Sequence, residues 1–103
     1  MIKYDLYLGM RSGKGAAAYE IGEAALRSFE EEFIRTRLAG YTIAVARGFF
    51  DGVQESSRIL TIVAEGDDPI IRDTVYQIAE DYKREMRQES VLVIETTVKG
   101  EFV

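Results

Sequence analysis

The 103-residue sequence contains no cysteine and no histidine, and it has a single proline. The absence of cysteine excludes disulfides, thiolate nucleophiles and thiolate metal sites. The absence of histidine removes the commonest metal ligand and the side chain that most often transfers protons near neutral pH. The composition therefore favours a non-catalytic role without a cofactor or a metal. An enzyme built on this chain would rely on Tyr, Glu or Asp, and Arg.

The chain has fewer basic than acidic residues: it contains 13 Lys and Arg and 18 Asp and Glu, which gives a net charge of −5. Proteins that bind duplex nucleic acid need a basic surface to neutralise phosphates, so we do not expect such a partner. No apolar run approaches the roughly 18 residues that span a bilayer, and the N-terminus lacks the apolar segment of a signal peptide. We expect one domain over residues 1–103, without a membrane partner and located in the cytoplasm.

In the first forty residues, the spacing of the apolar side chains changes from every second position to every third or fourth. Apolar and polar residues alternate over 2–8, which predicts a strand with Tyr4 and Tyr7 on opposite faces. A Gly- and Ser-containing loop follows. From about Tyr19 to Leu38 the apolar residues recur every three or four positions, and Gly40 comes directly after them. This pattern predicts a helix that ends at the glycine.

The rest of the chain predicts a hairpin, a helix and a last strand. Asp51-Gly52 is a strong hairpin signal; a two-residue loop would place Val45 opposite Arg58, and a longer loop through Val53 and Gln54 is equally compatible with the pattern. Asp68-Pro69 predicts the N-cap and first residue of a helix. Residues 90–103 predict a strand of up to 13 residues.

The element order is therefore β-α-β-β-α-β, which predicts an α+β, ferredoxin-like fold. Its sheet has four antiparallel strands, with two helices on one face. Right-handed crossovers place the first and last strands side by side, and the second strand of the hairpin flanks the first strand on its other side.

Three loops of this arrangement meet at one end of the sheet: residues 11–15, 48–55 and 88–90. The first loop is not a P-loop, because the first glycine of that motif would fall on Leu8. Cationic and amide donors over a Gly-rich turn can hold an anion, and neighbouring aromatic rings can stack on a base, although such residues also occur in solvent-exposed turns and in interfaces. The predicted ligand-binding residues are Arg11, Ser12, Gly13, Lys14, Gly15, Arg47, Phe49, Phe50, Gln88, Glu89 and Ser90.

The sheet face without helices predicts association. Part of this face is apolar, and exposed apolar area of that kind usually marks an interface. The long last strand also offers an unpaired edge. We expect a homo-oligomer formed through the sheet face and the C-terminal strand.

Three short motifs carry a resemblance to a known family: "DLYLG" (residues 5–9), "GFFDG" (48–52) and "QESVLV" (88–93). Together they resemble a family of small phage and bacterial proteins of unknown function. The resemblance supports the βαββαβ fold and implies a possible phage origin, with the host cytoplasm as the location in that case. It implies no established activity.

These observations favour a non-catalytic, oligomeric protein that senses or sequesters a small anionic molecule. A nucleotide is one candidate, and counter-defence would be the role of such a protein in a phage. The first alternative is a protein-binding module or inhibitor that acts through the exposed sheet face or by strand addition at the edge. The second is an isomerase or a monooxygenase-like enzyme that works without histidine or cysteine.

Overall fold

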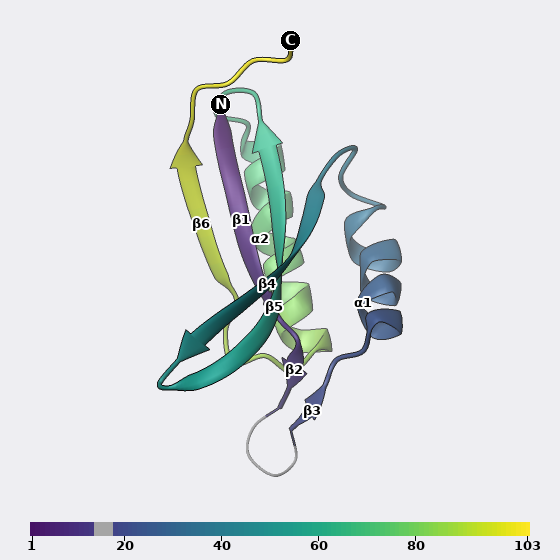
Figure 1. Ribbon diagram of the computed structural model, residues 1–103. Coiled ribbons are helices and arrows are strands. Elements are labelled where there is room, and N and C mark those ends of the chain that lie inside the picture. The colour runs from purple at the N-terminus through teal and green to yellow at the C-terminus, as the bar shows by residue number, and fades with distance from the viewer. Residues whose placement is uncertain (14–17) are drawn as a thin grey trace.

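A computed structural model of the chain describes residues 1–13 and 18–103. Its main sheet is antiparallel and has the strand order β4-β5-β1-β6 (Figure 1). The strands are β1 (Ile2–Gly9), β4 (Thr42–Phe50), β5 (Val53–Ala64) and β6 (Leu92–Thr97). The predicted α+β class and the predicted strand order are both confirmed.

The two helices cover one face of this sheet. In Figure 1, α2 (Pro69–Glu85) lies behind β1 and β5, and α1 (Glu23–Phe29) lies to its right and continues into a single π-helical turn, η2 (Glu30–Ile34). Tyr82 of α2 meets Phe29 of α1 edge to face, with ring centroids 5.0 Å apart. The apolar core lies between the helices and the sheet.

Alternation along β1 separates the core from the open face, as predicted. Tyr4, Leu6 and Leu8 are fully buried beneath the helices. Asp5 and Tyr7 point to the other face, because successive strand residues face opposite sides. Tyr4 is therefore the core tyrosine of this strand.

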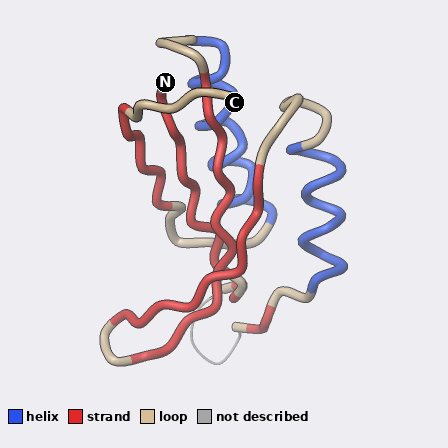
Figure 2. Tube along the Cα trace, turned by 45° about the horizontal axis from the view of Figure 1, so that its top comes forward, coloured by secondary structure: helices blue, strands red, loops and turns tan. Residues whose placement is uncertain are grey.

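The hairpin of β4 and β5 is closed by the two-residue loop Asp51-Gly52. Asp51 and Gly52 both have positive φ angles, 50° and 75°, and Val45 pairs with Arg58. The longer loop is excluded. β1 pairs with β5 only from Ser57 onward, so residues 48–56 form an arm that extends past the end of β1. Figure 2 shows this hairpin arm projecting from the sheet.

The prediction for the first helix was wrong at its start and its end: the helix begins at Glu23 and, with η2 included, ends at Ile34. Tyr19 and Glu20 form a short strand, β3, which pairs with β2 (Arg11–Ser12) in what was expected to be a loop. The backbone N–H of Ile21 donates to the carbonyl oxygen of Met10 at 2.7 Å. This bond joins segments distant in sequence, and helical periodicity carries no sign of it.

The last strand was predicted too long: β6 has 6 residues. Its partner is β1, and β1 begins at Ile2, so a longer β6 would have no strand to pair with. Two backbone hydrogen bonds between Met1 and Val98, of 2.9 and 3.1 Å, close this end of the sheet. The tail then crosses above the N-terminus (Figure 1).

The second helix begins as predicted. The Asp68 side chain accepts hydrogen bonds from the backbone N–H groups of Ile70 and Ile71, and Pro69 is the first helical residue. Within the described ranges, no helix has both the length and the apolar character that crossing a membrane requires.

Candidate functional site

A groove of about 1120 Å³ lies where β1 ends, between the hairpin arm, the β2–β3 ribbon and the turn from α2 into β6. We call it the loop-end groove. It is the place where the sequence predicted three loops to meet. Its aromatic residues are Tyr7, Phe49 and Phe50. Its polar lining includes glutamine amides and serine hydroxyls, so it offers both apolar surface and hydrogen-bonding groups.

The groove brings most of the predicted site together. The predicted residues that line it are Arg11, Gly13, Phe49, Phe50, Gln88, Glu89 and Ser90. Lys14 and Gly15 lie outside the described residues. Ligand binding by this set stays a prediction.

Two predicted residues do not line the groove. Ser12 is fully buried, and its hydroxyl has no hydrogen-bond partner among the described residues. Along β2 the side chain of Arg11 is exposed, and that of Ser12 faces the opposite, inner side. Arg47 is exposed on β4. Arg47 does not line the groove, although Gly48, the next residue of β4, does.

Three important lining residues were not predicted from the sequence: Tyr7, Arg58 and Arg87. The tight hairpin register already placed Arg58 opposite Val45, and this signal could have brought it into the site. The position of Arg87 depends on a left-handed backbone, with φ 51°. That conformation is uncommon outside glycine and is not visible in the sequence.

Gln88 joins the segments that form the floor of the groove. Its side-chain Nε2 donates to the carbonyl oxygens of Arg11, at 2.7 Å, and of Met86, at 3.0 Å. The Gln88 amide also lies so close to Gly9 that a Cβ added there would be 2.5 Å from Oε1. A side chain at position 9 would therefore have to displace this amide.

Tyr82 fixes the same floor from the core. Its hydroxyl donates to the carbonyl oxygen of Gly9 at 2.6 Å. Burial raises the pKa of Tyr82, so this phenol stays protonated and keeps its donor role. The end of β1 is thereby held by Tyr82 of α2 and by Gln88 of the turn that follows this helix.

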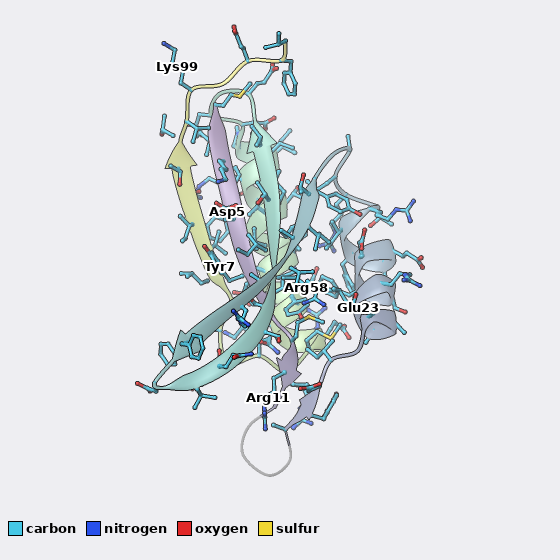
Figure 3. All side chains as sticks on the ribbon, viewed as in Figure 1. Asp5, Tyr7, Arg11, Glu23, Arg58 and Lys99 are labelled. Carbon is cyan, nitrogen blue, oxygen red and sulfur yellow. The ribbon has the colours of Figure 1, made fainter. Side chains whose placement is uncertain are left out.

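Charges of both signs line the groove. The arginines are Arg11, Arg58 and Arg87, and the glutamates are Glu20, Glu55 and Glu89. Arg58 is further paired with Glu23, at the start of α1, and Figure 3 shows these two side chains meeting between β5 and α1. The described lining thus carries no net excess of positive charge.

The aromatic residues of the hairpin arm are unusually exposed. Phe49 is 70% exposed and Phe50 is 71% exposed. Burying a phenylalanine side chain is worth about 1.5–3 kcal/mol relative to leaving it in water. These two rings therefore offer binding energy that the isolated chain does not use.

The open sheet face combines exposed apolar residues with one central carboxylate. Leu92 and Ile94 on β6 and Val63 on β5 are exposed there. Asp5 accepts a 2.6 Å hydrogen bond from the Thr61 hydroxyl and lies 3.4 Å from the Lys3 ammonium. No group of three metal-binding side chains occurs among residues 1–13 and 18–103.

A second hollow, of about 580 Å³, lies at the opposite end of the sheet, between the C-terminal tail and the segment before β4. Its lining is mostly apolar. Tyr41, one of its polar residues, already donates a 2.5 Å hydrogen bond to Glu30. The loop-end groove is the better candidate site, because it carries the charged and amide groups that orient a ligand.

Comparisons with known proteins agree with the fold. Proteins of curated function give no match. Among solved structures, a phage SAM lyase in its apo state has a TM-score of 0.70 at 18% sequence identity, covering 92% of this chain and 78% of the other. A phage SAM lyase in complex with S-methyl-5′-thioadenosine has a TM-score of 0.63 at 16% identity, covering 92% and 79%. At such identities the likeness shows a shared fold and no shared activity.

A family model matches residues 3–102, and its family is described as a protein of unknown function, DUF3574. The three motifs that suggested a family of unknown function lie within this range. Because the match spans nearly the whole sequence, the chain belongs to the DUF3574 family of proteins of unknown function.

Proposed function

We propose that this protein binds a small nucleoside in the loop-end groove. The observation that carries the proposal is the presence, in one groove, of two exposed phenylalanines and a set of amide, hydroxyl and carboxylate groups. Aromatic rings stack on any base, and the polar groups are of the kind that hydrogen-bond to ribose hydroxyls. The solved phage SAM lyase with the same fold and bound S-methyl-5′-thioadenosine supports a nucleoside as the ligand class.

The charge balance favours a nucleoside over a nucleotide with several phosphates. Three arginines and three glutamates line the described groove, and one of those arginines is ion-paired with Glu23. A triphosphate needs several unopposed cationic donors, and this lining does not supply them. The proposal therefore narrows the small anionic molecule expected from the sequence to a nucleoside with little charge.

Calorimetric titration with S-methyl-5′-thioadenosine tests the proposal. We expect saturable binding that weakens about tenfold in Phe49→Ala or Phe50→Ala, since stacking contributes about 1–3 kcal/mol per base. Phe102→Ala is the matched control, because Phe102 is 87% exposed and lies outside the loop-end groove. Absence of binding at millimolar concentration, or equal weakening by Phe102→Ala, would contradict the proposal.

A second candidate function is catalysis on a nucleoside, and the fold shared with a SAM lyase is the observation that favours it. Chromatography of S-adenosylmethionine incubated with the protein tests it directly. Turnover that disappears in Phe49→Ala would establish an enzyme. Unchanged S-adenosylmethionine together with saturable nucleoside binding would support the binding role.

We also propose that a second copy of the chain covers the open sheet face. The exposed Leu92, Ile94 and Val63 form an apolar surface, and β6 pairs only with β1 among the described strands. Light scattering after gel filtration should give a mass above that of one chain. Ile94→Lys should shift the protein toward the monomer, because it places a charge in the apolar interface. A monomer at high protein concentration would contradict this arrangement and would favour a different protein partner.

A further inference from the structure

Arg58 differs from the other arginines of the loop-end groove in how firmly the sheet holds it. It lies on β5, where it pairs with Leu8 of β1 and Val45 of β4, so strands flank it on both sides. Its side chain is only 14% exposed, yet it lines the groove. A cation held on a rigid strand is a suitable anchor for one specific group of a ligand.

The partners of Arg58 leave its guanidinium able to receive another acceptor. Nη1 donates to the carbonyl oxygen of Ser57 at 3.2 Å, and Nη2 donates to a carboxylate oxygen of Glu23. The guanidinium has five N–H donors and is shaped for two parallel bonds to one carboxylate. The Ser57 contact orients the group, and the Glu23 contact shows that a carboxylate fits against it.

Glu23 is the weaker half of this pair. Its side chain is 65% exposed, and exposed ion pairs contribute little stability. The Asp81 carboxylate that pairs with Arg37 is only 4% exposed by contrast, so that pair is expected to be fixed. Glu23 can move into solvent at small cost, whereas Arg58 cannot.

We infer that Arg58 binds a carboxylate carried by the ligand, and that Glu23 occupies the place of this carboxylate when the groove is empty. The inference rests on the proposed nucleoside binding and makes it more specific. The preferred ligand is a nucleoside derivative that bears one carboxylate. Binding exchanges one carboxylate partner of Arg58 for another, so the buried cation is paired in both states.

The test compares two probes that differ only in the carboxylate. S-Adenosylhomocysteine carries it, and decarboxylated S-adenosylhomocysteine does not; S-methyl-5′-thioadenosine serves as the shared nucleoside reference. By calorimetry at low salt, we expect the carboxylated probe to bind about tenfold more tightly, as for a charge-assisted hydrogen bond. In Arg58→Gln the ratio of the two affinities should fall to about one.

Glu23→Gln gives the opposite result, because it removes the competing charge without changing the shape of the side chain. The affinity ratio should rise about threefold, in line with the modest strength of an exposed ion pair. Glu95→Gln is the matched control: Glu95 pairs with Arg72 at 2.9 Å and lies outside the groove. It should leave the ratio unchanged.

The outcomes separate this inference from the proposed function. If S-methyl-5′-thioadenosine does not bind, the proposed function fails and the role of Arg58 fails with it. If that nucleoside binds but the wild-type affinity ratio is near one, or Glu23→Gln does not raise it, only the role of Arg58 is overturned. Should circular dichroism show that Arg58→Gln is unfolded, Arg58→Lys replaces it. Lysine keeps the charge but loses the two-bond geometry, so the ratio should still fall severalfold.

Discussion

Replacing Gly9 by alanine tests the packing that forms the floor of the loop-end groove. The new Cβ would lie 2.5 Å from Oε1 of Gln88, so the Gln88 amide must move. Moving it breaks the hydrogen bonds from Nε2 to the carbonyl oxygens of Arg11 and Met86. The perturbation is therefore a steric conflict whose cost is the loss of two hydrogen bonds.

The expected change in the free energy of unfolding follows from these contacts. Each hydrogen bond contributes about 0.5–1.5 kcal/mol, so losing both costs about 1–3 kcal/mol. Replacing glycine by alanine within a strand restores roughly 0.5–1 kcal/mol, because alanine has less freedom in the unfolded chain. From the midpoints of these two ranges, Gly9→Ala should thus lower the stability by about 1 kcal/mol, which corresponds to roughly 4–8 °C in Tm.

Urea denaturation of a double-mutant cycle identifies the cause. In a Gln88→Ala background the steric conflict is absent, so Gly9→Ala should no longer destabilise the protein. Gly48→Ala is the matched control, because a Cβ there meets no atom within 4 Å; it should be neutral or slightly stabilising. A Gly9→Ala protein as stable as the wild type, or one equally destabilised in both backgrounds, would contradict a steric conflict between the new Cβ at position 9 and the Gln88 amide.

Three further predictions concern the helix-side contacts. Burial alone would raise the pKa of Asp81, but hydrogen bonds from Arg37 and other donors outweigh burial and lower that pKa. Asp81→Asn should therefore lower the free energy of unfolding by about 1–3 kcal/mol at pH 7, as measured by urea denaturation. The difference in stability from the wild type should shrink as the pH falls below 3.8, the ordinary pKa of the group. Burial and the Glu30 hydrogen bond raise the pKa of Tyr41 to about 12 from 10.0, so its stabilisation is complete below pH 10 and is lost toward pH 12. Base-induced unfolding should therefore be shallower in Tyr41→Phe, and identical curves would contradict this. Asp68→Ala removes the side-chain cap of α2 and should lower the stability by about 1 kcal/mol; an unchanged urea midpoint would show that the cap contributes nothing.

The elements that could be predicted from the amino-acid sequence are those whose signals are local. The alternation in β1, the Asp51-Gly52 turn and the Asp68-Pro69 helix start each depend on a few neighbouring residues, and the structure has all three. With the handedness of crossovers they also determine the strand order. The meeting of three loops at one end of the sheet follows from that order, and so most of the loop-end groove could be predicted.

Tertiary contacts decided the rest. The β2–β3 pairing and the Ile21–Met10 hydrogen bond shift the start of the first helix to a later residue than the sequence predicted. The end of β6 depends on where its partner β1 begins. The pairing of Arg58 with Glu23 joins residues 35 positions apart. Such contacts depend on how separate segments pack, and residue periodicity reports only on the segment that contains it. The ion pair between Arg58 and Glu23 therefore became visible only in the folded chain.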